Sequence, residues 1–273
     1  GALNTILSLG TPFPRVTAVS AGNHAVAVAY AARTLGGDAK VVMLSTANPY
    51  RVQLAQAYGA EVIIVDDGRA AFDRARDIEK QENRAFIHPF EGRSVAEGTG
   101  CVGLELMEDE PGLDAVVVAI GGGGLAGGVA CAVKQINPGC AVYGVEPEGA
   151  AVMSSSLDMQ RPASLATVNT IADSLAPPMT TDFPFDMCNR FLDEVVTVSD
   201  DEIACAMVLS CAELKLALEP AGAAALAAVL GPLKLKLNGK NVAIIICGSN
   251  IDAASFIKIL ERGQAILQQK EVS

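Results

Sequence analysis

The sequence predicts an α/β protein built from two parallel-sheet α/β domains. Short apolar runs rich in β-branched residues alternate with longer, alanine-rich amphipathic segments along the 273 residues. Strands that are apolar throughout and separated by helices are typical of parallel sheets covered on both faces. Glycines mark the expected turns, as at Gly59 and Gly139. Hydrophobic residues make up 51% of the chain and charged residues 19%, so a sizeable core is expected.

Six strands and eight helices follow from these patterns. The strands are expected at Val16–Ser20, Ala39–Leu44, Glu61–Val65, Ala115–Ile120, Ala141–Val145 and Val242–Cys247. The helices are expected at about 23–36, 49–58, 69–82, 94–109, 124–136, 200–218, 220–230 and 252–269. Residues 15–91 are predicted to form a small domain, and residues 1–14 and 92–273 a larger one. The proline-punctuated stretch 153–193 is expected to be a long connection.

The composition argues against several classes of partner. A net charge of −11 leaves no basic patch for nucleic acid or anionic lipid. The seven cysteines form no C-x-x-C pair and the two histidines are far apart, so neither a disulfide framework nor a zinc site is expected. Residues 115–133 carry no charge, but their glycines divide them into a strand, a loop and a helix rather than a membrane span. The first ten residues do not resemble a signal peptide, and a reduced, cytoplasmic setting is expected.

A run of four glycines, Gly121 to Gly124, follows the apolar strand AVVVAI and opens a helix at Leu125. Glycines allow a tight turn that presents several N–H groups to one anion, and the helix N-terminus adds partial positive charge. The loop lacks the Lys-Ser/Thr ending of a Walker A motif and meets the dinucleotide-binding spacing only loosely. Phosphate binding is therefore favoured over a turn that only allows close packing.

A second loop, Ser20-Ala21-Gly22-Asn23-His24, also joins a predicted strand to a predicted helix. Ser20 is expected to cap that helix, and the loop N–H groups could bind a carboxylate. The Asn23 amide could donate a hydrogen bond to a phenolic oxygen. Taken alone this motif is weak, and a simple helix cap is the favoured interpretation of it. His24 is expected to be packed or hydrogen-bonded rather than catalytic.

A third loop, Cys247-Gly248-Ser249-Asn250, follows the apolar run NVAIIIC. A small polar side chain at the carboxyl end of a parallel strand points into the crevice where ligands of α/β sheets bind. Cys247 is therefore a candidate ligand-contacting residue, although most free cysteines behave as small buried hydrophobic residues.

These three loops, in this order and at these separations, resemble the fold type II pyridoxal-phosphate family. The nearest members by motif are the serine/threonine dehydratases (threonine ammonia-lyases) and serine racemase. The likeness runs nearly from end to end, and the ordered set of motifs is far more specific than any one of them. The further matching segments are Asn48–Asp66, His88-Pro89, Gly98–Leu106, Gly144–Pro147, Thr170–Asp173 and Glu219–Gly222.

The resemblance implies pyridoxal 5′-phosphate as the cofactor, bound mainly by the larger domain. Its phosphate would be held by Gly121, Gly122, Gly123, Gly124 and Leu125. Asn23 would contact the 3′-oxygen of the ring, Cys247 would lie at the pyridine nitrogen, and Glu219 would lie near the ring. The substrate carboxylate would be received by Ser20, Ala21, Gly22 and Asn23.

Two departures from the family pattern refine these implications. Relatives that racemise carry a second serine where this chain has Ala21, and an alanine methyl cannot transfer a proton. Racemase-like members bind a divalent cation through a Glu and an Asp six residues later, whereas here Glu146 is followed at that distance by Val152. A tight metal site is therefore not expected, leaving at most a weak one that uses Glu146 and a backbone carbonyl near Ala150.

The family lysine that forms the Schiff base lies in a Ser-x-Lys-x-Arg-Gly-Ala run. Gly1 to Asn4 matches the residues just after that arginine. The resemblance therefore places the lysine three residues before Gly1, and it places an N-terminal part of the larger domain before Gly1 as well. The lysines within the sequence have charged or polar surroundings typical of solvated faces. Those considered as replacements are Lys40, Lys134, Lys215, Lys234, Lys236 and Lys240.

The resemblance implies a lyase that converts L-serine, L-threonine or a related β-hydroxy amino acid to a 2-oxo acid and ammonia. Two alternatives stay open. One is a non-catalytic fragment or pseudoenzyme, because the cofactor lysine is not in the sequence. The other keeps the fold but changes the chemistry to racemisation or β-replacement, and Ala21 argues against racemisation. A homodimer is also implied.

Overall fold

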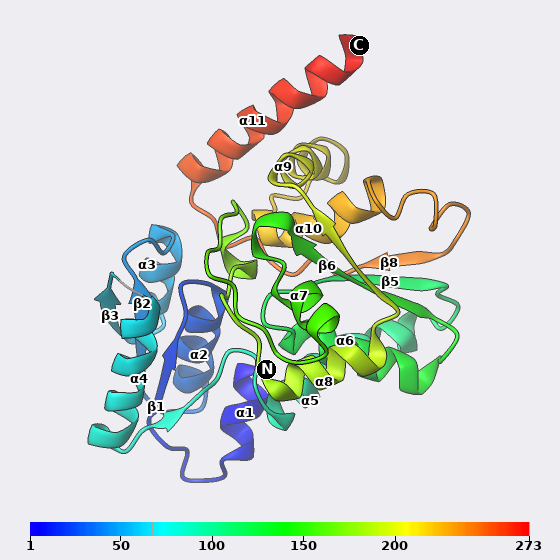
Figure 1. The fold of residues 1–273 in the computed structure, drawn as a ribbon. Helices are drawn as coiled ribbons and strands as arrows, with labels where there is room; N and C mark the ends of the chain where they lie inside the picture. Colours follow the sequence, from blue (N-terminus) through cyan, green and yellow to red (C-terminus); the bar gives the residue numbers. More distant parts are fainter. Residues whose placement is uncertain (67, 273) are drawn as a thin grey trace. The chain divides into compact units, whose positions relative to one another are not determined.

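The computed structural model describes residues 1–66 and 68–272 (Figure 1). It divides into two compact units, residues 1–98 and residues 99–273. Each unit contains one four-stranded sheet in which every paired strand is parallel to its neighbour. The prediction of two parallel-sheet α/β units is therefore confirmed.

The first unit has the strand order β3-β2-β1-β4. Its strands are β1 (Val16–Val19), β2 (Ala39–Leu44), β3 (Glu61–Val65) and β4 (Ala85–Phe86). Its helices are α1 (Ala2–Ser8), α2 (Asn23–Thr34), α3 (Pro49–Ala57) and α4 (Gly68–Glu82), and α5 (Arg93–Asp109) begins in it. Buried side chains of β1 and β2 pack on one face against α1, α2 and α3, and on the other face against α4.

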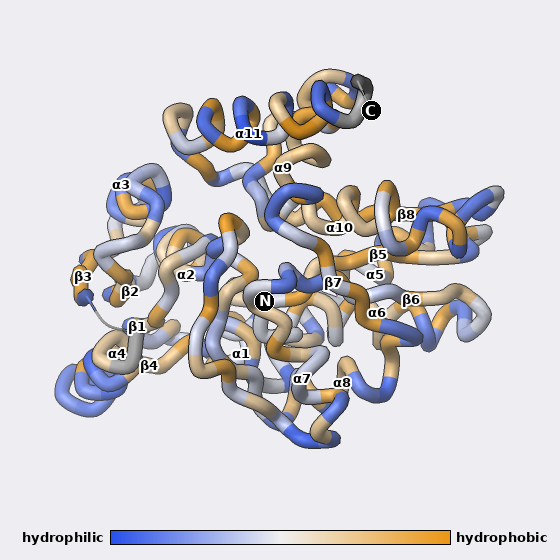
Figure 2. Tube along the Cα trace, turned by 45° about the horizontal axis from the view of Figure 1, so that its top comes forward, coloured by the Kyte–Doolittle hydropathy of each residue, from blue (hydrophilic) through white to orange (hydrophobic). Residues whose placement is uncertain are grey.

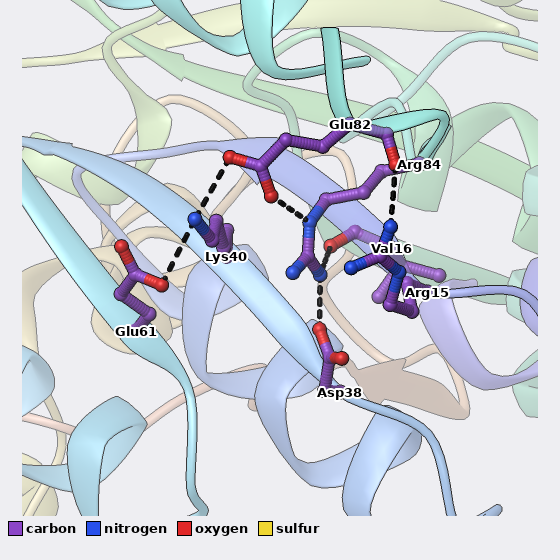
Figure 3. Close-up of polar contacts among 7 residues, drawn as sticks. All are labelled: Arg15, Val16, Asp38, Lys40, Glu61, Glu82 and Arg84. Carbon is purple, nitrogen blue, oxygen red and sulfur yellow. Dashed lines mark hydrogen bonds and ion pairs between the residues drawn. The ribbon is translucent and has the colours of Figure 1, made fainter.

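Charged side chains gather where the strands of this first sheet begin. Arg84, whose side chain is only 5% exposed, forms ion pairs with Asp38 and with Glu82. Lys40 pairs with Glu82 at 2.8 Å and with Glu61 at 3.0 Å, so Figure 3 shows Glu82 bonded to both basic side chains. These contacts lower the pKa of Glu82 to about 2, with the hydrogen bond from Lys40 the largest cause. Each basic side chain of the cluster is thus paired with two carboxylates, and the cluster ties the amino ends of the strands together.

The second unit has the strand order β7-β6-β5-β8. Its strands are β5 (Ala115–Ala119), β6 (Ala141–Pro147), β7 (Glu194–Val198) and β8 (Val242–Ile244). Its helices are α6 (Gly124–Ile136), α7 (Val152–Met159), α8 (Asp182–Phe191), α9 (Asp200–Leu209), α10 (Pro220–Leu230) and α11 (Ala253–Val272). Short 3₁₀ turns occur at Glu148–Ala150 and Asp173–Leu175.

The central strand β5 is buried along its whole length and separates two hydrophobic clusters. Ala115, Val117 and Ala119 face the cluster that contains α9 and α10, whereas Val116 and Val118 face the cluster that contains α6 and α8. Figure 2 shows hydrophobic residues along β5 and hydrophilic residues gathered on α4. The alternating, fully buried strand is what a parallel sheet with helices on both faces requires.

Several elements differ from the sequence-based expectation. The stretch 153–193 contains α7 and α8 rather than only a connection, and α8 accommodates Pro184 in its first turn. The helix expected over 200–218 ends at Leu209 and continues as a π-helical turn over Ser210–Leu214, with Lys215 at a positive φ of 58°. The strand expected to reach Cys247 ends at Ile244. The elements not predicted are α1, α7, α8, β4 and β7.

The two compact units also divide the chain differently from the predicted domains. Residues 1–14 and 92–98 fall in the first unit instead of the second. The local reason is visible in that unit, because the Asn4 side chain donates to the Ser94 carbonyl at 2.8 Å and α1 packs against α2. Within the described part of the chain, no helix is both long and apolar enough to cross a membrane.

Candidate active site

The glycine loop lies between β5 and α6, where the sequence analysis expected a phosphate-binding turn. Gly127 makes the first backbone hydrogen bond of α6, donating to the Gly123 carbonyl at 2.8 Å. The N–H groups from Gly121 to Ala126 have no acceptor among the residues that the structure describes. Such a row of N–H groups at a helix N-terminus fits an anion with several oxygens.

The carbonyl groups of the same loop are already used. Gly122 accepts a hydrogen bond from the Thr180 hydroxyl at 2.9 Å, and Gly124 accepts one from the Thr99 hydroxyl at 2.8 Å. The loop therefore satisfies its acceptors internally and leaves its donors for a ligand. Neither threonine stands out in the sequence: Thr99 lies in the matching segment Gly98–Leu106 without a role of its own there, and Thr180 lies in the stretch expected to be a connection.

Gly123 shows why this loop needs glycine. It is the N-cap of α6 and has a left-handed φ of 95°, which side chains rarely adopt. A Cβ atom added there would lie 2.7 Å from the Cε atom of Met153. The local geometry thus fits a phosphate of the kind that the resemblance implies, held by backbone groups from Gly121 to Leu125.

The start of α10 packs closely on the third loop. Glu219, which is fully buried, is the N-cap of α10, and its N–H donates to the Gly248 carbonyl at 3.2 Å. A Cβ atom added at Gly222 would lie only 2.3 Å from that same carbonyl oxygen. The two segments that the resemblance places beside the cofactor ring are therefore neighbours in the second unit.

Cys247 keeps its proton at neutral pH. Its thiol donates to the Ala221 carbonyl at 3.5 Å. Although much of the residue is exposed, burial of the thiol raises its pKa to about 11, and the negative charge of Glu219 acts in the same direction. A protonated thiol is a weak, neutral hydrogen-bonding group. It cannot stabilise a positive charge on a ring nitrogen in the way that a carboxylate does.

The Ser20 loop follows β1 in the first unit. The Ser20 hydroxyl accepts from the Gly22 N–H at 2.9 Å, and the N-cap of α2 is Gly22, without a side-chain capping bond. The expectation that Ser20 caps the helix directly is therefore wrong, because its hydroxyl closes a turn two residues earlier. Ala21 and Asn23 lie in this same turn at the start of α2. The turn therefore stands at the N-terminus of α2, where helix N–H groups suit a carboxylate.

Two histidines support the carboxyl end of this first sheet. The His24 ring bonds through Nε2 to the Ile87 carbonyl at 2.9 Å. The His88 Nδ1 atom accepts from the Glu91 N–H at 2.9 Å and from the Phe90 N–H at 3.3 Å. Burial lowers the pKa of each histidine to about 4. Both rings are therefore neutral at physiological pH, and His24 is a hydrogen-bonded helix residue, as the sequence predicted.

The six lysines considered above as replacements are paired or exposed. Lys134 pairs with Asp193 at 2.7 Å, and Lys40, at the beginning of β2, is held by the two carboxylates already described. Lys236 forms an ion pair with Glu194. The remaining three lysines considered above are exposed: Lys215, Lys234 and Lys240.

Glu146 is fully buried, but its oxygens already have partners. It accepts hydrogen bonds from the N–H groups of Met153 and Ser154 at 2.6 and 2.8 Å, and from the Ser154 hydroxyl at 2.7 Å. Ala150 is buried nearby in sequence. In the described part of the chain, no group of three or more His, Cys, Asp or Glu residues is arranged to hold a metal ion. The weak site at Glu146 and Ala150 stays a prediction.

Comparison with proteins of known function fits these features. The chain is 49% identical over 265 residues to the phenylserine dehydratase of Ralstonia pickettii, covering 96% of this chain and 81% of that protein. It is 39% identical to the L-threonine ammonia-lyase of Thermotoga maritima, of which it covers 66%. Among solved structures, the processed form of threonine deaminase isoform 2 from Solanum lycopersicum matches with a TM-score of 0.89 at 32% identity, covering 96% of this chain and 77% of that one. Maize serine racemase matches with a TM-score of 0.88, also at 32% identity, covering 98% of this chain and 83% of that one.

The family model described as "pyridoxal-phosphate dependent enzyme" matches residues 1–248. That match covers most of the chain, including all three loops. The cofactor implied by the resemblance, pyridoxal 5′-phosphate, is confirmed by this family assignment. The chain therefore belongs to the fold type II pyridoxal-phosphate dependent enzymes, among relatives that are serine/threonine dehydratases and ammonia-lyases.

Proposed function

We propose that this protein catalyses the dehydration and deamination of a β-hydroxy amino acid, giving a 2-oxo acid and ammonia. The observation that carries the proposal is the glycine loop, which leaves the N–H groups from Gly121 to Ala126 without protein acceptors. It occurs in a chain 49% identical to a phenylserine dehydratase. L-Serine, L-threonine and 3-phenylserine are the substrates that its relatives' chemistry suggests first.

Two groups of residues would make the contacts with the cofactor and the substrate. In the second unit, Gly121–Leu125 would hold the cofactor phosphate, Cys247 would contact the pyridine nitrogen, and Glu219 would lie near the ring. In the first unit, the turn Ser20–Asn23 would receive the substrate carboxylate, and the Asn23 amide would donate to the 3′-oxygen. When bound, pyridoxal phosphate supplies an electron sink that acidifies the α-proton of the amino acid.

The state of Cys247 favours elimination within this family. Its pKa of about 11 leaves the thiol neutral at physiological pH. A neutral thiol weakens the pull of the ring on electrons, and β-elimination tolerates this because the hydroxide leaves promptly. The base that removes the α-proton is proposed to be the lysine with which this family forms its Schiff base.

Racemisation is the main competing chemistry, because serine racemases are among the relatives. That reaction needs an acid/base group on each face of the α-carbon. Ala21 carries no transferable proton at the position where the resemblance places the second serine. We therefore propose that elimination dominates over racemisation.

Product partition tests this proposal. The protein with added pyridoxal phosphate is incubated with L-serine, L-threonine and 3-phenylserine, and 2-oxo acid, ammonia and D-amino acid are measured. We expect 2-oxo acid and ammonia in equal amounts, with little D-isomer. The matched variant Ala21→Ser should form more D-isomer. D-amino acid as the main product of the unaltered protein, or no product from any of the three substrates, would contradict the proposal.

We further propose a homodimer that works in the cytoplasm. Seven free cysteines, three of them buried, are compatible with a reducing compartment. Exposed leucines offer apolar surface for association: Leu3 and Leu7 on α1, and Leu9 directly after it. Light scattering of the purified protein would report the oligomeric state.

A further inference from the structure

Three side chains donate hydrogen bonds to three consecutive carbonyl groups of the glycine loop. What we infer from these bonds rests on the proposal that the loop holds the cofactor phosphate. The three bonds run from Thr180 Oγ1 to Gly122 at 2.9 Å, from Cys188 Sγ to Gly123 at 3.6 Å, and from Thr99 Oγ1 to Gly124 at 2.8 Å. We call these three donors the carbonyl clamp.

One donor, Cys188, lies on α8, which packs tightly against the start of α6; Thr180 lies just before α8 and Thr99 lies on α5. Thr180 is 4% exposed and Cys188 is fully buried. A Cβ atom added at Gly127 would lie 2.8 Å from the Met187 Cβ atom, so the two helices approach closely. Burial raises the pKa of Cys188 to about 12, which keeps its S–H available as a donor at any working pH. The donors are therefore fixed in place before a ligand arrives.

Peptide geometry connects the clamp to ligand binding. In a planar trans peptide, the carbonyl of one residue and the N–H of the next point in opposite directions. Holding the carbonyls of Gly122 and Gly123 toward Thr180 and Cys188 therefore turns the N–H groups of Gly123 and Gly124 away from these donors. The same relation fixes the N–H of Leu125 through the carbonyl of Gly124.

We propose that Thr180, assisted by Cys188 and Thr99, is a positioning residue that aims the N–H groups of the glycine loop at the cofactor phosphate. Thr180 is the decisive member because its hydroxyl is the buried partner of the Gly122 carbonyl. Without that donor the peptide between Gly122 and Gly123 is free to rotate, and the Gly123 N–H no longer points at a fixed position. Glycine makes this freedom large, because its backbone has few steric restrictions.

A matched pair of variants tests the proposal. Thr180→Val keeps the shape of the side chain but removes the hydroxyl, whereas Thr180→Ser keeps the hydroxyl. The control is Thr181→Val, which makes the same chemical change at the adjacent residue. The Thr181 hydroxyl is buried and has no hydrogen-bond partner among the described residues. For each protein, the dissociation constants of pyridoxal 5′-phosphate and of pyridoxal, which lacks the phosphate, are measured by absorbance, and the bound phosphate is observed by ³¹P NMR.

We expect Thr180→Val to weaken binding of pyridoxal phosphate about tenfold, the size of one lost hydrogen bond to a buried carbonyl. Pyridoxal affinity should change less than twofold, and the ³¹P signal should shift. Thr180→Ser and Thr181→Val should match the unaltered protein. Equal losses for both ligands, or a Thr180→Val protein that binds like Thr181→Val, would overturn the proposal. These readouts need no turnover, so they are independent of whether the protein is a dehydratase.

Discussion

Replacing Gly222 by alanine perturbs the contact between the start of α10 and the Cys247 loop. The added Cβ atom would lie 2.3 Å from the Gly248 carbonyl oxygen, whereas ordinary van der Waals contact begins at 3.4 Å. The two segments must separate by about 1 Å, because the obstacle is backbone and cannot rotate away. Overpacking of this kind costs about 2 kcal/mol of unfolding free energy. A misplacement of about 1 Å at a reacting centre reduces activity by about 100-fold.

The control for this change is Gly112→Ala in the same unit, because a Cβ atom there meets nothing within 4 Å. Urea unfolding gives the free energy of unfolding, and initial rates of 2-oxo acid formation give kcat/KM. We expect Gly222→Ala to lose about 2 kcal/mol of stability and about 100-fold in kcat/KM. Gly112→Ala should change neither quantity appreciably. If the two variants behaved alike, the close packing of α10 on the Cys247 loop would not matter for the site.

Two further predictions concern the first unit. His24 and His88 titrate near 6.5 when unfolded and at about 4 when folded, so the unfolded chain binds more protons between these values. The free energy of unfolding should fall by on the order of 2 kcal/mol per histidine as pH drops from 6.5 to 4. A variant with glutamine in place of both histidines should lose this pH dependence, and an unchanged slope of unfolding free energy against pH would contradict the prediction. Arg84→Met should lower the free energy of unfolding, measured with urea, by about 2 kcal/mol. The control is Arg93→Met, because the Arg93 side chain is 85% exposed, and it should lower that free energy by less than about 0.5 kcal/mol. Equal losses would refute the role of the cluster in Figure 3.

The regular parts of the fold could be predicted because they follow hydrophobic periodicity. The strands at Ala39–Leu44 and Glu61–Val65 have the expected bounds, as does the helix over Pro220–Leu230. Two of the missed elements, β4 and α8, lack such a signal. The strand at Ala85–Phe86 is only two residues long. The helix α8 carries Pro184 near its start, and in the sequence alone such prolines indicate irregular chain rather than a helix. The strand Glu194–Val198 was detectable from its β-branched residues.

The candidate site divides in the same way. Its loops can be recognised from the sequence, because runs such as Gly121–Gly124 are rare and have few physical explanations. The residues that hold those loops in shape cannot be recognised in this way, because a threonine such as Thr180 acts through a hydrogen bond to a backbone carbonyl that forms only in the folded chain. The role expected for Ser20 was wrong for a related reason, because capping depends on where the helix begins, and it begins two residues later than that role requires.

The central claim is that this protein eliminates water from a β-hydroxy amino acid with pyridoxal 5′-phosphate as cofactor. The most direct measurement is the rate of 2-oxo acid release from L-threonine and 3-phenylserine before cofactor removal, after removal and after its return. We predict release that disappears with the cofactor and recovers when it is restored, with one ammonia formed for each 2-oxo acid. Release that persists after complete cofactor removal, or no release from the reconstituted protein, would contradict the claim.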